Sequence, residues 1–253
     1  MRRPLVVGNW KMRGSSHVIH ALLAAMRPGA DTISDVDVCV CAPFVYLDQC
    51  SRQLAGSRLM LGAQNVGNHE PGDYTGEVSA SMLLEFGCRY VIVGHSERRH
   101  HYGESSALVA ARFASALRHG IIPVLCLGES LRERKSGSTC NVVNEQLDAV
   151  LDLCGVASLQ RAVVAYEPVW AIGTGHTASA EQAQAVHAHI RQRIRRLSAE
   201  VADSLQLLYG GSVKPDNAHD LFAMPDIDGG LVGGASLDAA AFLAVCNAAK
   251  PLS

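Results

Sequence analysis

The chain has 253 residues, 48% of them hydrophobic, and its 22 basic and 24 acidic side chains leave a formal net charge of −2. This composition predicts a folded chain with a large core and argues against disorder. A nucleic-acid-binding protein would carry a basic excess, which is absent. No apolar run reaches the roughly 18 residues of a membrane span, so we expect no membrane partner.

The eight cysteines do not form the spacing of a metal or dithiol site, because no Cys-x-x-Cys pair occurs. Several lie inside apolar runs, where a free thiol packs as a small hydrophobic side chain. We therefore expect buried free thiols and a reducing, cytoplasmic location. The cysteines are Cys39, Cys41, Cys50, Cys88, Cys126, Cys140, Cys154 and Cys246.

Eight short apolar runs, rich in β-branched residues, recur along the chain. Each is nearly continuous, which is typical of strands buried on both faces of a parallel sheet. They cover 5–10, 37–43, 59–65, 90–95, 121–127, 162–167, 205–210 and 230–234.

Helical periodicity fills the stretches between these runs. It is clearest in 105–119, with Gly120 as the expected C-cap, and in 180–197, where four arginines from Arg191 to Arg196 are expected on a solvated face. A last helix is expected to begin at Ser236, with Asp238 in its first turn. Eight strand–helix units in about 250 residues predict one (β/α)8 barrel domain over 1–253; a doubly wound open sheet is the alternative.

In such a barrel, the residues that follow the carboxyl ends of the strands carry function. Asn9 and Lys11 follow the first run, His95 and Glu97 the fourth, and Glu167 the sixth. A histidine and a carboxylate in this position suit proton transfer, and a lysine suits an anion. Taken singly, each could be a structural polar residue. Their meeting at one rim weakens that alternative.

Glycine-rich turns follow the seventh and eighth runs, around Ser212 and at Gly233 and Gly234. Because glycine lets backbone N–H groups approach an anion, paired turns after these strands favour a phosphate site. The GTGH segment at 173–176 lacks the spacing and acidic partner of a dinucleotide fingerprint, and the histidines show no metal-ligand spacing. We expect no metal site.

Five motifs together resemble triosephosphate isomerases, in family order and over essentially the whole chain. They are NWKM at 9–12, VGHSERR at 93–99, AYEPVWAIGTG at 165–175, YGGSV at 209–213 and LVGGASL at 231–237. Arg13 departs from the pattern, since many members carry asparagine there. The resemblance implies a TIM barrel that interconverts dihydroxyacetone phosphate and D-glyceraldehyde 3-phosphate through an enediolate, in glycolysis and gluconeogenesis, without a cofactor.

The same resemblance implies the catalytic roles. Glu167 would move the carbon-bound proton, and His95, kept neutral by the helix after it, would polarise the carbonyl. Lys11 would stabilise negative charge and Asn9 would position substrate and hold Lys11. Glu97 would pair with Lys11 or relay protons, or else be only an acidic residue at a helix start.

Phosphate would be bound by Gly173, Ser212, Gly233 and Gly234, and the stretch after Glu167 would form a lid rather than a merely ordered loop. The lid residues are Pro168, Val169, Trp170, Ala171, Ile172, Gly173, Thr174, Gly175 and His176. The loop 66–78, with Thr75, would enter a second subunit of a homodimer; the alternative is an exposed turn. The rival functions are a non-catalytic phosphate-binding barrel and another phosphosugar isomerase.

Overall fold

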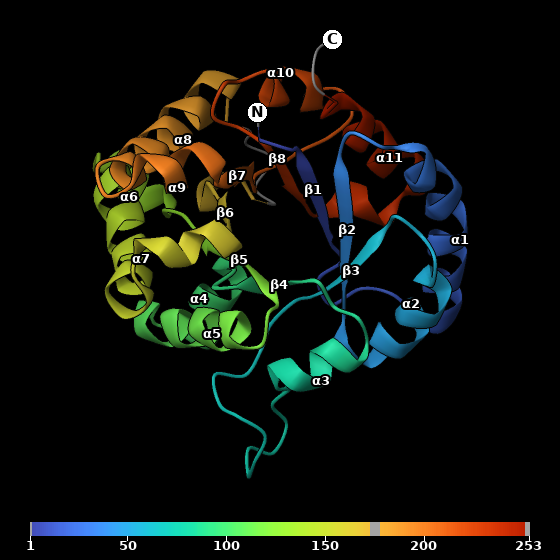
Figure 1. Ribbon diagram of the computed structural model, residues 1–253. Helices are drawn as coiled ribbons and strands as arrows, with labels where there is room; N and C mark the ends of the chain where they lie inside the picture. Colours follow the sequence, from blue (N-terminus) through green and yellow to red (C-terminus); the bar gives the residue numbers. More distant parts are fainter. Residues whose placement is uncertain (1, 173–177, 251–253) are drawn as a thin grey trace.

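A computed structural model describes residues 2–172 and 178–250. Its strands close into an eight-stranded parallel barrel in which β1 pairs with both β2 and β8. Helices form a ring around the strands (Figure 1). The predicted barrel is confirmed, and the open sheet is wrong. The strands are β1 Leu5–Asn9, β2 Asp37–Ala42, β3 Met60–Ala63, β4 Tyr90–Val93, β5 Ile122–Leu127, β6 Val163–Tyr166, β7 Gln206–Tyr209 and β8 Gly229–Val232.

Helices follow the strands, and polar side chains cap the N-termini of several of them. Serines accept a backbone N–H at the starts of several helices, such as Ser105 for α5 and Ser179 for α8. The helices are α1 Ser16–Thr32, α2 Leu47–Leu54, α3 Ala80–Glu85, α4 Ser96–Tyr102, α5 Ser106–Arg118, α6 Leu131–Lys135, α7 Thr139–Cys154, α8 Ala180–Arg195, α9 Ala199–Ser204, α10 Ala218–Phe222 and α11 Ala239–Ala248, with 3-10 turns at η1 Phe44–Tyr46, η2 Val156–Arg161, η3 Val169–Ala171 and η4 Gly234–Leu237.

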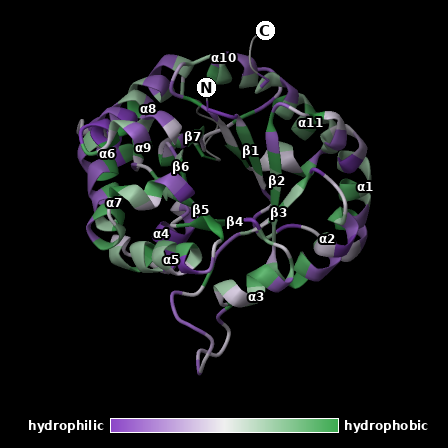
Figure 2. Ribbon diagram, in the orientation of Figure 1, coloured by the Kyte–Doolittle hydropathy of each residue, from purple (hydrophilic) through white to green (hydrophobic). Residues whose placement is uncertain are grey.

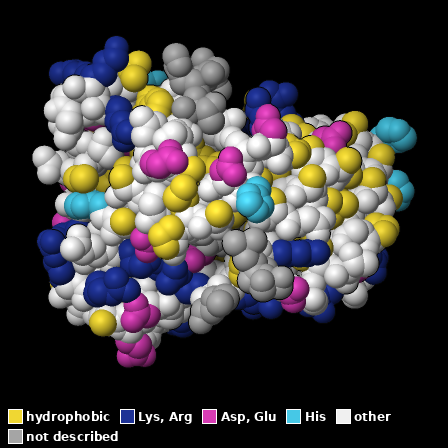
Figure 3. All heavy atoms as spheres, turned by 90° about the horizontal axis from the view of Figure 1, so that it is seen from above, with side chains coloured by type: hydrophobic (Ala, Val, Ile, Leu, Met, Phe, Trp, Pro, Cys, Tyr) yellow, Lys and Arg dark blue, Asp and Glu magenta, His cyan; other side chains and the backbone are white. Residues whose placement is uncertain are grey.

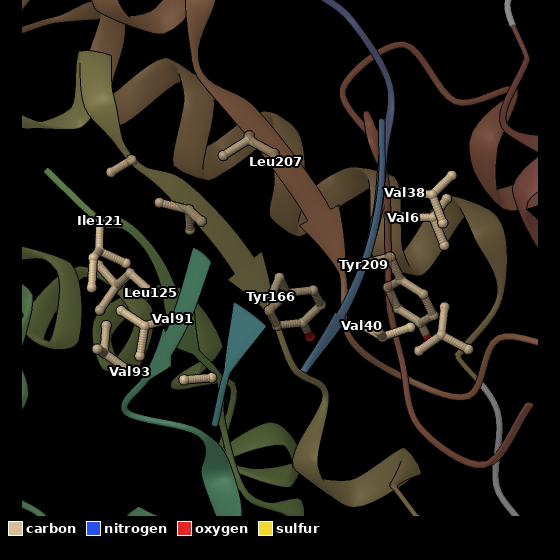
Figure 4. Close-up of a cluster of buried hydrophobic side chains, with 14 of the residues drawn as sticks. Val6, Val38, Val40, Val91, Val93, Ile121, Leu125, Tyr166, Leu207 and Tyr209 are labelled. Carbon is tan, nitrogen blue, oxygen red and sulfur yellow. The ribbon is translucent and has the colours of Figure 1, made fainter. Parts of the chain in front are cut away.

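The strands bury both faces, as the apolar runs predict. Along β1, Leu5 and Val7 belong to the cluster inside the barrel, whereas Val6 belongs to the cluster between strands and helices. Figure 4 shows side chains of this outer cluster, with Tyr166 and Tyr209 among them. The helices mix hydrophobic and hydrophilic residues (Figure 2), because only one side of each packs against the strands.

Three details of the helices differ from expectation. Arg191 is 3% exposed instead of solvated, because its guanidinium pairs with Asp226 and Asp228. Leu197 lies beyond the end of α8 and is exposed. Ser236 falls within the short turn η4, and α11 begins later, with Asp238 as its N-cap.

All eight cysteines are free; six are buried, Cys154 is half-buried and Cys140 is exposed. Within the described residues, no helix combines the length and the apolarity that crossing a membrane requires. Basic and acidic side chains are interspersed on the face seen in Figure 3. The loop between β3 and α3 projects beyond the ring of helices (Figure 1), and residues 69–77 within it are all exposed.

Candidate active site

The predicted site residues meet in one cavity of about 360 Å³ at the carboxyl ends of the strands. These ends converge because all eight strands are parallel. Every predicted catalytic residue and every described phosphate-binding residue lines this cavity: Asn9, Lys11, His95, Glu97, Glu167, Ser212, Gly233 and Gly234. Sequence positions as far apart as 9 and 234 therefore form a single site.

Glu167 occupies the centre of the site, directly after β6. Its carboxylate accepts a 2.8 Å hydrogen bond from the Ser96 backbone N–H, and its other oxygen lies 3.0 Å from His95 Nε2. Glycines make room for it: a Cβ at Gly210 would lie 2.9 Å from Glu167 Cγ, and one at Gly128 would lie 1.8 Å from the Glu167 carbonyl oxygen. The side chain is 2% exposed.

The charge on Glu167 is set by opposing effects. Burial raises the pKa of this carboxyl, but the charge and hydrogen bond of His95, together with the Ser96 N–H, bring the pKa below its usual value. Glu167 is therefore an ionised carboxylate held almost out of water. Such a group can accept a proton from a bound molecule.

His95 is the N-cap of α4, and its Nδ1 accepts a 3.2 Å hydrogen bond from the Glu97 backbone N–H. An N–H can donate only to an unprotonated nitrogen, so a neutral ring carries its proton on Nε2, facing Glu167. Burial lowers the pKa of His95, but the neighbouring Glu167 carboxylate raises it above its usual value overall. The Glu167 carboxylate therefore acts on the charge of His95 in addition to the helix that follows it, which the sequence predicts as the cause of a neutral ring.

Lys11 has a strained backbone, with a φ of 52° that is unique among the described residues other than glycine. Two side chains hold it: Asn9 Oδ1 accepts from the Lys11 N–H at 3.0 Å, and Gln64 Nε2 donates to the Lys11 carbonyl at 2.9 Å. The Lys11 ammonium lies 2.7 Å from Glu97 Oε1. These contacts therefore hold the Lys11 ammonium at the cavity.

The glycine turns form another part of the lining. A Cβ at Gly233 would lie 3.6 Å from Lys11 Cε, and a Cβ at Gly234 would meet open space. Ser236 fixes this turn, because its hydroxyl donates to the Gly233 carbonyl at 2.6 Å and its own carbonyl accepts from Trp10 Nε1 at 3.1 Å. The turn can thus present backbone N–H groups to an anion beside Lys11.

The stretch predicted as a lid is only partly described. Pro168 precedes the η3 turn, which contains Val169, Trp170 and Ala171. These three residues do not line the cavity, whereas Ile172 does. Gly173, Thr174, Gly175 and His176 lie outside the described residues.

Sequence reasoning missed three residues near the site. Glu129 is fully buried after β5 and accepts hydrogen bonds from Tyr166 Oη at 3.1 Å and from Trp170 Nε1 at 2.9 Å. Arg134 lies over the Trp170 ring at 5.2 Å. Lys214 lines the cavity beyond the Ser212 turn. The only available signal was their position shortly after strand ends.

No group of histidine, cysteine and carboxylate side chains in 2–172 and 178–250 has the arrangement of a metal site. Arg13, which departs from the motif, is an exposed residue of the loop after β1.

Comparison with known proteins shows the family of this chain. A family model described as triosephosphate isomerase matches residues 4–249. The chain belongs to the triosephosphate isomerase family. It is 62% identical to the triosephosphate isomerase of Thiobacillus denitrificans over 98% of this chain and 99% of that protein. The triosephosphate isomerase of Methylococcus capsulatus is 57% identical over 98% of this chain and 98% of that protein. That of Dechloromonas aromatica is 57% identical over 99% of this chain and 100% of that protein. The family's eight-stranded barrel thus accounts for the architecture in Figure 1.

Proposed function

We propose that this protein interconverts dihydroxyacetone phosphate and D-glyceraldehyde 3-phosphate, as its family membership indicates. One observation supports the chemistry above all others: an ionised, buried Glu167 lies 3.0 Å from the ring of His95 in a cavity that also holds Lys11. This arrangement offers a base for a carbon-bound proton and a donor for the adjacent oxygen. The reaction needs both groups.

Glu167 removes a proton from the carbon beside the carbonyl and returns it to the neighbouring carbon. Burial helps, because water does not compete for a carboxylate that is 2% exposed. The Ser96 N–H and His95 hold it while the site is empty. A substrate between Glu167 and His95 replaces the second contact, which frees the carboxylate for the proton.

His95 donates from Nε2 to the substrate oxygens. Its Nδ1 is occupied by the Glu97 N–H, so Nε2 is the nitrogen that faces the reacting atoms. A substrate that separates His95 from Glu167 removes the contact that raises the His95 pKa. The neutral ring is then favoured, and it can donate to the enediolate and take a proton back.

Lys11 stabilises the negative charge that develops on the enediolate oxygen and on the phosphate. Asn9 positions the substrate oxygens and holds the Lys11 backbone. Glu97 fixes the Lys11 ammonium through their 2.7 Å ion pair. That pair favours the first of the three possibilities left open for Glu97, which is pairing with Lys11.

Phosphate lies against the N–H groups of Ser212, Gly233 and Gly234, with Gly173 as a further proposed contact. Residues 168–176 act as a lid over the bound substrate. The Trp170 side chain supports this role, because its bond to buried Glu129 fixes the start of the stretch beside the site.

A coupled assay on glyceraldehyde 3-phosphate with the purified protein tests the function. Glu167→Gln removes the base, and we expect kcat to fall by about 10²–10⁴. The matched control is Glu200→Gln at an exposed position of α9, which should keep wild-type turnover. Wild-type protein without activity would favour a phosphate-binding barrel, and turnover of a different phosphosugar alone would favour another isomerase.

We also propose a homodimer that works in the cytoplasm. Residues 69–77 are all exposed, as are Met12 in the loop after β1, Val45 in the η1 turn and Tyr102 at the end of α4. Exposed apolar side chains of this kind suit a protein interface. The eight free thiols suit a reducing compartment.

Thr75→Arg tests the dimer, because it places a long charged side chain in the proposed interface. We expect sedimentation to show a monomer and the assay to show reduced turnover. Thr32→Arg at the exposed end of α1 is the control and should stay dimeric. A dimeric, fully active Thr75→Arg would remove this loop from the interface.

A further inference from the structure

We propose that Lys214 is the electrostatic guide of the site: its ammonium group draws the dianionic phosphate of the substrate into the cavity and speeds capture without taking part in proton transfer. This inference rests on the proposed function, since it needs a phosphorylated substrate. Lys214 lines the same cavity as Lys11 and Glu167, two residues beyond the Ser212 turn.

The charges of the lining show why such a guide is needed. The other ionised side chains that line the cavity are Lys11, Glu97 and Glu167. The Lys11 ammonium is already matched by Glu97 at 2.7 Å, and the Glu167 carboxylate remains. With His95 neutral, as its bond from the Glu97 N–H implies, the lining without Lys214 would therefore carry an excess negative charge and repel a dianion. The net charge of −2 on the whole chain offers no attraction either.

Lys214 is the cation that the acidic side chains leave unmatched. In residues 2–172 and 178–250, no carboxylate lies within ion-pair distance of its ammonium, although Asp216 and Asp220 are near in sequence. Its side chain is exposed, so the ammonium group has no desolvation cost. An unmatched cation at the mouth of a cleft is what accelerates the encounter with an anion.

The backbone at Lys214 is fixed, although its side chain reaches into solvent. The Lys214 N–H donates to Asn217 Oδ1 at 2.8 Å, and Asn217 Nδ2 donates to the Ser212 carbonyl at 3.0 Å. The N–H groups of Asn217 and Ala218 donate to the Lys214 carbonyl at 3.2 and 3.0 Å. Asn217 therefore ties the lysine to the proposed phosphate turn, so the charge stays beside it while the flexible stem follows the incoming anion.

The effect should be moderate and should depend on salt. A single exposed charge acts over about one Debye length, roughly 8 Å at physiological ionic strength and 3 Å at 1 M. We expect Lys214→Met to lower kcat/KM about three- to tenfold in low salt, with kcat within about twofold of wild type. In about 0.5 M NaCl the difference should shrink to less than about twofold.

Charge variants separate this role from a structural one. Lys214→Glu should lower kcat/KM further in low salt, and Lys214→Arg should restore it. Inhibition by inorganic phosphate should weaken in parallel in Lys214→Met. The matched control is Lys250→Met, which removes the same charge near the start of β8, at the opposite end of the barrel. That variant should keep the wild-type kcat/KM at every salt concentration.

The outcomes distinguish this inference from the proposed function. Wild-type protein without isomerase activity would contradict the function itself. An active wild type with a salt-independent loss in Lys214→Met, with no loss in low salt, or with a loss confined to kcat would overturn the guiding role. Failure of Lys214→Arg to restore kcat/KM would overturn it as well.

Discussion

The two ends of the barrel use charged side chains in opposite ways. At the amino ends of the strands, the Arg191 guanidinium pairs with Asp226 at 2.6 Å and with Asp228 at 2.8 Å. Asp228 also binds Arg2 and accepts from the Leu207 N–H. The donors and acceptors of this cluster satisfy one another.

At the carboxyl ends, charged side chains line a cavity, and their positions are fixed by backbone strain or by close contacts. Lys11 has a strained backbone, His95 and Glu167 face each other at 3.0 Å, and Lys214 has no acidic partner within the described ranges. Charged residues of the same types thus stabilise the fold at the amino end and line the proposed substrate site at the carboxyl end. Variants at the two ends should therefore separate stability from activity.

The largest effect on stability is expected at the amino end. Arg191→Ala leaves Asp226 without a cation and Asp228 with Arg2 alone, and breaking a buried pair in this way costs about 3–5 kcal/mol. We expect the melting temperature to fall by about 10 °C or more, measured at one protein concentration. The kcat of the folded protein should stay within about twofold of wild type. A large loss of kcat in folded Arg191→Ala would break the contrast between the ends.

At the carboxyl end, Lys11→Ala should do the reverse. It removes the cation from the cavity, and loss of one such charge-stabilising group lowers kcat by about 10²–10³. KM should rise as well, because the same charge faces the phosphate. The melting temperature should change little, because Asn9 and Gln64 hold the backbone at its φ of 52° through the N–H and carbonyl of residue 11, and both bonds remain in the variant. Unchanged kinetics would remove Lys11 from the site.

A smaller effect on stability should appear on acidification. Burial lowers the pKa of His187, which lies against Tyr166 and Tyr209, from 6.5 to about 4. Between these values the imidazole binds a proton in the unfolded chain but not in the folded chain. The contribution of neutral His187 to the free energy of unfolding is therefore fully present above pH 6.5 and is lost as the pH falls toward 4. The loss amounts to about 3 kcal/mol.

Denaturant unfolding of wild type and His187→Gln across this range measures the effect. The variant should lack this part of the pH dependence while keeping a hydrogen-bonding group near the Asp226 carbonyl. Equal pH dependence in the two proteins would show that His187 does not titrate as its burial implies.

The sequence predicted the fold well for a physical reason. Strands buried on both faces leave continuous apolar runs, and eight such runs match the eight strands to within a residue or two at their ends. Arg191 shows where this reasoning fails. Its place on the helix predicts exposure, but its partners, Asp226 and Asp228, come from a loop far along the chain, and periodicity within one helix cannot reveal them.

The site shows the same division. Asn9, His95 and Glu167 stand at strand ends in recognisable motifs, so the sequence places them at one rim. The contact that raises the His95 pKa depends on the distance between two strands and could not be predicted from either motif. Glu129 was missed because its role depends on a bond to Trp170, which lies 41 residues further along the chain.

The central claim is that Glu167 moves a carbon-bound proton at the carboxyl end of the barrel. Proton NMR of dihydroxyacetone phosphate incubated with the protein in D₂O tests it most directly, because a proton held on a carboxylate exchanges with solvent. Wild-type protein should replace hydrogen by deuterium at the carbon beside the carbonyl, and folded Glu167→Gln should lose this exchange by about 10²–10⁴. Exchange at the wild-type rate in folded Glu167→Gln would contradict the claim.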